Sequence, residues 1–138
     1  MRIRDFRLED ADSLVELLKA NQQYNHPDID GPEAMARVCE CQAAEFLVAE
    51  DEGQVIGMIR GTYDGSRDVI YLASVHPNHQ RQGIGRALVW DISPRFLEQG
   101  AASIAVIVPG DAGFWRKMNF RQTTRVMQAY PLAQVLEA

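Results

Sequence analysis

The sequence contains few cysteines and no long apolar run. Only Cys39 and Cys41 occur among 138 residues, two positions apart in a segment with a helical pattern, where their side chains point to different sides. Free thiols are therefore expected, and because a lone Cys-Glu-Cys is too small for a structural zinc site, no metal is expected. No apolar run approaches the roughly 20 residues that cross a bilayer, which excludes a membrane span.

An excess of basic residues and a secretory leader are also lacking. With 14 Lys and Arg against 19 Asp and Glu, the formal net charge is −5, whereas a nucleic-acid surface needs a concentrated basic face. The opening residues, Met1–Phe6, contain no apolar stretch of the kind found in secretory signals, so a cytoplasmic protein is expected. The 46% of hydrophobic residues fits one soluble domain over residues 1–138.

The hydrophobic pattern predicts a mixed α/β protein. Leu14 and Leu18 recur at helical spacing after a short strand, and Gly31-Pro32 opens a second helix with Cys39 on its apolar face. The triplet Asp51-Glu52-Gly53 is typical of a hairpin loop between two strands. The expected order is β-α-α-β-β-β-α-β-α-β, with strands at 2–6, 46–50, 54–62, 68–75, 103–108 and 122–130 and helices at 11–18, 32–39, 83–93 and 112–118.

Two segments decide the topology of the expected sheet. Residues 68–75 (DVIYLASV) are almost all β-branched, aromatic or small, which is typical of a strand that is central in its sheet and buried on both faces. The helix that follows and the strand at 103–108 complete a right-handed βαβ crossover, so these two strands should be parallel. Pro94 should kink or interrupt the helix, which can restart and end at Gly100.

Two glycines and two arginines separate strand 68–75 from the helix after it. A helix entered through Gly83 and Gly85 presents unpaired backbone N–H groups and the positive end of its dipole. Arg81 and Arg86 can add charge-assisted hydrogen bonds. This pattern favours a pyrophosphate cradle, although such glycines also serve simply to form a tight connection.

Known phosphate motifs narrow the interpretation. The dinucleotide fingerprint would require glycine at Leu88, and the P-loop would require Gly-Lys-Ser/Thr at 85–87, so neither matches. Instead, the run 75–88, V-x-P-x-x-Q-R-Q-G-I-G-R-A-L, resembles the signature of the GNAT superfamily of acyl-CoA-dependent N-acetyltransferases. Ile3-Arg4 with the helix that follows resembles the family's opening strand and helix, and 114–120 (FWRKMNF) resembles its late F-Y-x-K-x-G-F motif.

The resemblance covers nearly the whole chain and implies a GNAT-like fold that moves an acetyl group from acetyl-CoA to a primary amine by direct attack in a ternary complex. In that family the glycine loop binds the coenzyme A pyrophosphate through backbone amides. The strand before it is bulged and parts from the next parallel strand, so its backbone pairs with pantetheine and an amide near Val75 stabilises the oxyanion. The residues implied to contact the coenzyme are Ala73, Val75, Gln80, Arg81, Gln82, Gly83, Ile84, Gly85, Arg86 and Trp115.

The sequence departs from the family pattern where proton transfer is concerned. Trp115 stands where the family's usual acid, the tyrosine of F-Y-x-K-x-G-F, is found, and an indole N–H cannot serve as that acid. Tyr71 and Ser74 are the nearest alternative proton carriers, and Asp68 is the closest candidate base. Each also has a structural interpretation, since a buried tyrosine usually packs its ring and Asp68 can complete a turn.

The polar segment 21–30 is expected to form a loop at the rim of the acceptor pocket, a role that this segment commonly has in the family. His76 and His79, near the glycines, are interpreted as solvated loop residues. Carboxylates in segment 21–30 can also simply decorate a turn. The candidate substrate contacts in this segment are Tyr24, His26 and Asp28.

Two further expectations concern function and assembly. Trp115 motivates an alternative function, a non-catalytic acyl-CoA-binding regulatory or accessory protein, which would keep the coenzyme site without turnover. Related domains often pair through the last strand, here 122–130, so a homodimer through that strand is an expectation as well.

Overall fold

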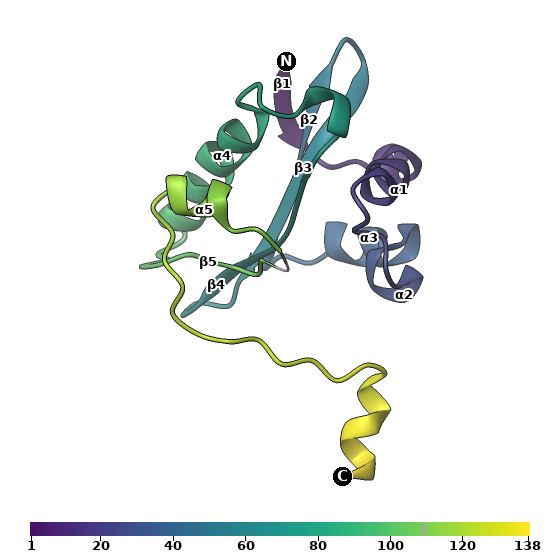
Figure 1. The fold of residues 1–138 in the computed structure, drawn as a ribbon, viewed down its shortest axis with the longest axis vertical. Helices are drawn as coiled ribbons and strands as arrows, with labels where there is room; N and C mark the ends of the chain where they lie inside the picture. Colours follow the sequence, from purple (N-terminus) through teal and green to yellow (C-terminus); the bar gives the residue numbers. More distant parts are fainter. Residues whose placement is uncertain (109) are drawn as a thin grey trace. The chain divides into compact units, whose positions relative to one another are not determined.

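The structure is a computed structural model that describes residues 1–108 and 110–138. The chain divides into two compact units, Met1–Val108 and Pro109–Ala138, and Figure 1 gives the element labels. In the part of the chain that the structure describes, no helix combines the length and the apolar character that a bilayer span requires.

Among the described residues, five strands of the first unit form one mixed sheet in the order β1-β2-β3-β4-β5. Strands β1 to β4 are antiparallel, and β5 runs parallel to β4 with Val69 opposite Ala105. The strands are β1 (Arg2–Asp5), β2 (Ala44–Asp51), β3 (Gln54–Tyr63), β4 (Asp68–Val75) and β5 (Ala105–Val106). The predicted α/β fold and the predicted parallel crossover are confirmed.

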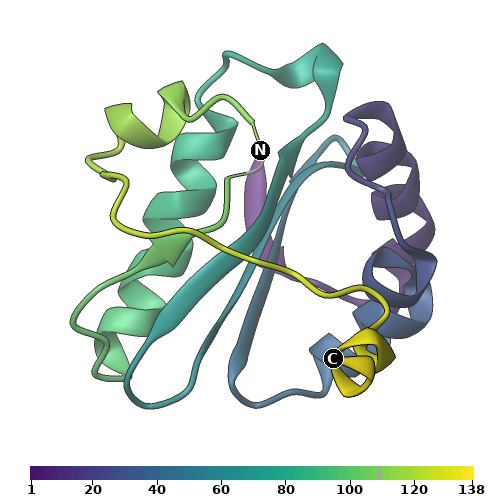
Figure 2. The same ribbon diagram turned by 60° about the horizontal axis from the view of Figure 1, so that its bottom comes forward.

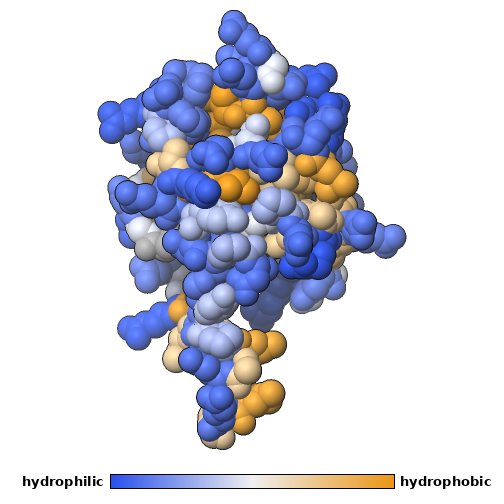
Figure 3. All heavy atoms as spheres, turned by 90° about the vertical axis from the view of Figure 1, so that its right-hand side faces the viewer, coloured by the Kyte–Doolittle hydropathy of each residue, from blue (hydrophilic) through white to orange (hydrophobic). Residues whose placement is uncertain are grey.

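Helices cover both faces of this sheet (Figure 2). One face carries α4 (Ile84–Glu98), the crossover helix between β4 and β5, and the other carries the helices that follow β1. Those helices are α1 (Ala11–Ala20), α2 (Pro27–Asp30) and α3 (Pro32–Cys39), preceded by a 3-10 turn at Leu8–Asp10. The surface over α1 to α3 is mostly hydrophilic, with apolar side chains in separate patches (Figure 3).

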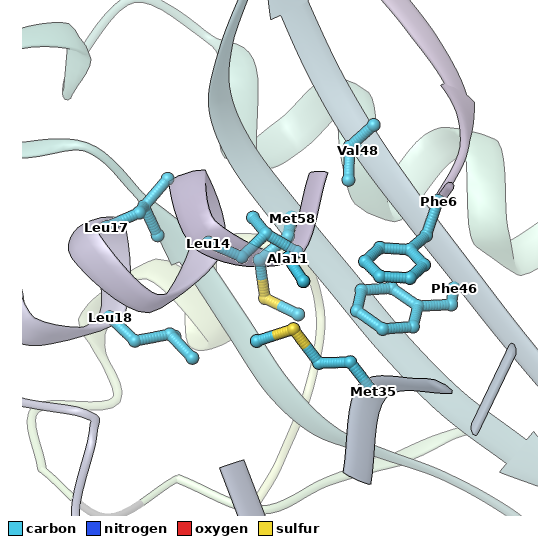
Figure 4. Packing of buried hydrophobic residues seen from close by; sticks show 9 residues of the cluster. All are labelled: Phe6, Ala11, Leu14, Leu17, Leu18, Met35, Phe46, Val48 and Met58. Carbon is cyan, nitrogen blue, oxygen red and sulfur yellow. The ribbon is translucent and has the colours of Figure 1, made fainter. Parts of the chain in front are cut away.

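A hydrophobic core joins α1 and α3 to β2 and β3 (Figure 4). Leu14 and Leu18, both predicted on the buried stripe of the first helix, are fully buried, and Phe6 stacks on Phe46 with ring centroids 4.2 Å apart. Burying one side chain of this size contributes roughly 1.5–3 kcal/mol, so the cluster holds both helices on the sheet. Its buried members are Phe6, Ala11, Leu14, Leu17, Leu18, Met35, Phe46, Val48 and Met58.

The predicted hairpin between β2 and β3 is confirmed, with a tighter turn than expected. The two strands pair as far as Asp51 and Gln54, so Glu52 and Gly53 form the loop. Both residues have positive φ, 51° and 79°. This combination is required by a two-residue type I′ turn, whose twist matches that of the strands.

Helix α4 runs continuously through Pro94, so the predicted restart is wrong. Pro94 and Trp90, whose carbonyl loses its hydrogen bond, are both exposed, and water can take the place of that bond. Ile92 and Phe96, on either side of the proline, are fully buried, and their burial offsets the roughly 3 kcal/mol that an interior proline costs. The helix ends before Gly100, as predicted.

Two strands near the crossover differ from expectation. β4 is second from the edge of the sheet rather than central, and Val69 and Ala73 are partly exposed. β5 is two residues long, whereas the sequence predicts a strand over 103–108. The apolar pattern identified both strands, but the length of a strand depends on its partner, and β5 pairs with β4 no further than Ile70.

The segment between α1 and α3 is more regular than the predicted polar loop. Pro27 occupies the first turn of the short helix α2, which ends at Asp30 and has Gly31 as its C-cap residue. In α3 the buried face is formed by Ala34 and Met35, and Cys39 is exposed, so its predicted place on the apolar face is wrong. Both cysteines of the chain are free thiols, as predicted.

The second unit contains one short α-helix at the predicted position. In this unit Trp115 lies edge-on to Phe114 and Phe120, with ring centroids 5.0 and 5.2 Å away. Residues 122–130, all of them described, form no strand, so the predicted last strand is wrong. The elements are α5 (Gly113–Lys117) and a 3-10 segment at Leu132–Glu137.

Candidate active site

One edge of β4 is open over its second half. β5 pairs with Val69 and Ile70, and the Ile107 N–H donates to the Ile70 carbonyl at 2.9 Å. Among the described residues, no strand pairs with 71–75 on this side. Beyond Ile70, β4 therefore presents an edge that no strand of the described chain covers.

A β-bulge at Tyr71 marks the start of this open edge. β3 and β4 pair Gly61 with Ile70 and Arg60 with Leu72, which leaves no residue of the described sheet opposite Tyr71. The extra residue shifts the alternation of the strand, so the backbone groups that follow change sides. The bulge lies in the strand for which the family resemblance implied one.

Beyond the bulge, the backbone groups of Ala73 and Val75 face the open edge. The His76 N–H donates to the Ile56 carbonyl of β3 at 2.8 Å, and every second residue of an antiparallel strand faces the same neighbour. Ser74 therefore faces β3, whereas Ala73 and Val75 face away from it. Their N–H groups point to the side on which a ligand could lie along β4.

Side-chain amides reach the carbonyls on this edge. Asn21, the C-cap of α1, donates from Nδ2 to the Val75 carbonyl at 2.8 Å and to Ser74 Oγ at 2.7 Å. Gln80 Nε2 donates to the same Val75 carbonyl at 3.0 Å and to Asn21 Oδ1 at 3.2 Å. The end of α1, the end of β4 and the start of the glycine loop are thus joined by one hydrogen-bond network.

Sequence reasoning missed this network. Besides Asn21, it overlooked Gln23, whose Nε2 donates to the Ala73 carbonyl at 3.1 Å. The available signal is the run of three side-chain amides, Asn21-Gln22-Gln23, directly after the apolar stripe of the first helix. Amides in that place can bond an exposed strand edge, but the sequence does not say which strand passes beside them.

The loop from β4 into α4 carries the expected unpaired N–H groups. Gly83, the N-cap of α4, has φ 83° and ψ 7° and contributes no side-chain cap. The Ala87 N–H donates to the Gly83 carbonyl at 3.0 Å, so the N–H groups of Ile84, Gly85 and Arg86 have no partner within the helix. Together with the helix dipole they form a positive end that suits an anion.

The polar side chains of this loop lie on its outside. Arg81, whose φ is 64°, Gln82 and Arg86 are exposed, and the Arg86 guanidinium lies 5.6 Å from the ring centroid of Trp90. Ile84 is buried, so a ligand could meet it only through its backbone. The loop and the open edge of β4 are adjacent. One ligand that contacts candidate coenzyme residues in both places needs this arrangement.

A buried arginine lies beside the bulge. Arg60 is 3% exposed, and its guanidinium carbon lies 5.3 Å from the ring centroid of Tyr71 and 5.6 Å from that of Phe46. Its Nη2 donates to the Ile29 carbonyl at 3.4 Å, and its Nε has no partner among the described residues. Burial raises the pKa of Tyr71, and the charge of Arg60 opposes that increase.

The other two predicted proton carriers lie apart from each other. Ser74 is buried, and its hydroxyl accepts from Asn21. Asp68 is six residues away along β4, about 20 Å at the usual rise of a strand. Asp68 is 5% exposed, neither carboxylate oxygen has a hydrogen-bond partner in the described chain, and burial raises its pKa.

The predicted substrate residues lie between Asn21 and α3. Tyr24 and His26 are partly buried, and Asp28 is exposed. His26 is the N-cap residue of α2. Because this segment starts at Asn21, the same hydrogen bonds that reach β4 also fix the beginning of the segment.

Two other predicted features can be placed. His76 Nδ1 accepts from the Asn78 N–H at 3.1 Å, which caps a short 3-10 turn. In residues 1–108 and 110–138, no group of three or more His, Cys, Asp and Glu could hold a metal ion. Trp115 belongs to the second unit, where its contacts are aromatic.

The chain matches known proteins in sequence and in fold. The family model described as acetyltransferase (GNAT) family matches residues 11–120, and an acetyltransferase of Photorhabdus laumondii is 35% identical over 111 residues, covering 80% of this chain and 77% of the relative. A transcriptional regulator from Bacillus halodurans has a similar structure, with a TM-score of 0.79 and 22% identity, covering 94% of this chain and 98% of the other. The PaiA N-acetyltransferase from Thermoplasma acidophilum, solved in complex with coenzyme A, has a TM-score of 0.72 and 15% identity, covering 86% of each chain. The chain belongs to the acetyltransferase (GNAT) family.

Proposed function

We propose that this acetyltransferase uses acetyl-CoA and acetylates a primary amine. The observation that carries the proposal is the open edge of β4, which leads directly to the unpaired N–H groups at the start of α4. A long ligand with a pyrophosphate and an amide-containing arm, such as coenzyme A, matches that arrangement of donors. The similar fold of an N-acetyltransferase solved in complex with coenzyme A supports the proposal.

In this proposal the coenzyme is held mainly by backbone groups. The pyrophosphate accepts from the N–H groups at the start of α4, and Arg81 and Arg86 neutralise its charge. Within the described chain, nothing lies within 4 Å of a Cβ built on Gly83, so the space beside the loop is open to a ligand. The proposed contacts in the first unit are Ala73, Val75, Gln80, Arg81, Gln82, Gly83, Ile84, Gly85 and Arg86.

The proposed chemistry is a direct transfer. Bound acetyl-CoA supplies the acetyl group as a thioester, which the amine attacks in a ternary complex without a covalent enzyme intermediate. The Val75 N–H donates to the carbonyl oxygen as negative charge develops on it. When the C–S bond breaks, the Tyr71 hydroxyl donates a proton to the departing thiolate, and the nearby charge of Arg60 stabilises the phenolate that forms. The proton that the attacking nitrogen loses as the amide forms then returns to this phenolate, which restores the tyrosine.

Ser74 and Asp68 are the other proposed proton carriers. The hydroxyl hydrogen of Ser74 is not used by the bond from Asn21, in which Ser74 accepts. Asp68 is suited to hold a proton, because its burial without a partner favours the neutral carboxyl group. The acceptor amine is proposed to meet Tyr24, His26 and Asp28, where the Asp28 carboxylate attracts its cationic form.

Calorimetry with acetyl-CoA tests the coenzyme site. The wild-type chain should bind, and the double variant Gly83→Glu, Gly85→Glu should bind at least about tenfold more weakly, because two carboxylates repel a pyrophosphate at the helix start. Thermal unfolding of the variant shows whether it has kept its fold. Equal binding by both proteins would contradict the proposed site.

A non-catalytic acyl-CoA-binding regulatory or accessory protein is the second candidate function. Trp115 favours this second function, because it stands where the family motif has the tyrosine that serves as the general acid. This function predicts coenzyme binding without turnover. A screen of amines for release of free thiol from acetyl-CoA separates the two, since steady release above the rate without acceptor excludes the second function.

A further inference from the structure

Asn21 lies where three elements of the first unit meet. Its backbone caps the end of α1, and its Nδ2 donates to Val75 and Ser74 at the end of β4. Its Oδ1 accepts from Gln80 at the start of the glycine loop. A primary amide has two N–H donors and one carbonyl oxygen, so each polar atom of this side chain is engaged.

We propose that Asn21 is a positioning residue that fixes the open edge of β4 and the glycine loop in one arrangement before the coenzyme binds. The inference rests on the proposed function, because it assigns the coenzyme to this edge and this loop. A site that is already ordered loses less conformational freedom on binding, which increases affinity without any contact between Asn21 and the ligand.

The same network determines how Val75 can meet a ligand. A carbonyl oxygen has two lone pairs, and that of Val75 accepts from Asn21 at 2.8 Å and from Gln80 at 3.0 Å. The protein therefore fills both acceptor positions, and the Val75 N–H alone remains for the ligand. At this residue the edge accommodates a ligand carbonyl, whereas a ligand N–H finds no acceptor. Val75 can therefore contact a ligand only as a hydrogen-bond donor. A residue that pairs with an added strand would both donate from its N–H and accept at its carbonyl.

Gln80 carries the effect into the glycine loop. It directly precedes Arg81, whose φ of 64° lies in the left-handed region that residues with a Cβ rarely adopt. Such a conformation needs support from its surroundings. The two hydrogen bonds of the Gln80 side chain, one of them to Asn21, provide that support at the point where the loop leaves β4.

Two variants separate positioning from ordinary stabilisation. Asn21→Asp keeps the shape of the side chain but replaces the Nδ2 donor by an oxygen, which repels the Val75 carbonyl. Asn21→Leu removes every side-chain hydrogen bond without adding charge. A matched control is Gln99→Leu, because Gln99 Nε2 donates to Glu45 Oε1 at 3.0 Å and joins the opposite end of α4 to β2.

Two measurements are needed, one of them without ligand. In the ligand-free chain, the NMR order parameters of residues 81–86 should fall from about 0.85 to below about 0.6 in both Asn21 variants. Calorimetry should show coenzyme A binding about tenfold weaker in both, since each lost hydrogen bond changes an equilibrium about fivefold. The Gln99→Leu chain should match the wild type in both measurements.

The outcomes distinguish this inference from the function on which it rests. If wild type and both Asn21 variants bind coenzyme A equally, with unchanged order parameters, the positioning role is overturned and the proposed site stands. If Gln99→Leu weakens binding as much as the Asn21 variants do, the effect is general destabilisation, and the positioning role is again overturned. If the wild type does not bind coenzyme A, the proposed function falls, and the role of Asn21 toward the coenzyme falls with it.

Discussion

The Arg60 guanidinium carbon lies 5.3 Å from the ring centroid of Tyr71, at the bulge where β4 loses its parallel partner. Arg60 is almost completely buried, and Asp30 acts on it only through space. A buried cation without a close carboxylate is unfavourable in itself. Arg60 lies beside Tyr71, which stands at the start of the open edge. This position is the basis for proposing Tyr71 as the acid and for the first prediction.

Arg60→Met should lower activity without lowering stability. Methionine fills a similar volume and needs no hydration, so the free energy of unfolding should stay the same or increase. Without the positive charge, the pKa of Tyr71 should rise further, and kcat should fall about tenfold while KM for acetyl-CoA is unchanged. Steady-state kinetics and urea unfolding measure the two effects.

The pH profile supplies the control for that prediction. The charge of Arg60 opposes the increase that burial causes in the pKa of Tyr71. Loss of Arg60 should therefore move the alkaline limb of kcat to higher pH, and Tyr71→Phe should remove that limb. An alkaline limb that stays in place in Arg60→Met would show that Arg60 does not act on the catalytic acid.

Gly83→Ala and Gly53→Ala should destabilise the fold equally but affect the coenzyme differently. The two glycines have nearly the same φ, 83° and 79°, and nothing in the described chain lies within 4 Å of a Cβ built on either. The left-handed backbone should cost each alanine variant about 1–2 kcal/mol in the free energy of unfolding. Coenzyme A affinity, measured by calorimetry, should fall in Gly83→Ala alone, because its methyl group would enter the proposed cradle. Equal affinities of the two variants would contradict this use of the loop.

Asp68→Asn should stabilise the protein at neutral pH. Burial raises the folded pKa of Asp68 above its ordinary value of 3.8. Between these two pKa values the folded chain holds a proton that the unfolded chain releases, so wild-type stability falls as pH rises through this window and stays lower above it. The variant lacks this fall, and its free energy of unfolding at pH 7 should exceed that of the wild type by about 1–3 kcal/mol.

Urea unfolding at pH 4 and pH 7 measures the effect of Asp68. The difference between variant and wild type should be smaller at pH 4 than at pH 7, because the wild type loses stability as pH rises through the raised pKa of Asp68. Activity provides a second readout, since full activity in Asp68→Asn would remove Asp68 from the proposed proton carriers. A difference in stability that does not change with pH would contradict the charge-based explanation.

The parts of the fold that the sequence predicted correctly depend on local patterns. The period of Leu14 and Leu18 defines α1, the triplet around Gly53 defines the hairpin, and the spacing of Gly83 and Gly85 defines the start of α4. In each case, residues within one turn or one strand carry the information. Propensity and turn chemistry were therefore sufficient.

The features that were missed depend on contacts between distant residues. Pro94 breaks the local rule for helices, and the burial of Ile92 and Phe96 against the sheet overrides it. The early end of β5 follows from its pairing with β4, and the role of Asn21 from bonds to residues more than 50 positions away. No pattern within a single segment encodes these relationships. The early end of β5 is nevertheless the feature that leaves the edge of β4 open beyond Ile70.

Asp10→Asn should destabilise the protein in a pH-dependent way opposite to that of Asp68→Asn. Arg4 donates from Nη1 and Nη2 to the two carboxylate oxygens of Asp10, both at 2.9 Å, and the Arg7 N–H donates at 2.8 Å. Burial alone would raise the pKa of Asp10, but these hydrogen bonds hold it below 3.8. The stabilisation is therefore complete above pH 3.8 and lost as pH falls through the folded pKa.

At pH 7, removing one partner of this buried pair should cost about 3–5 kcal/mol. Urea unfolding should show the difference shrinking below pH 3.8, and a constant difference would mean that Asn fails for reasons of packing rather than charge.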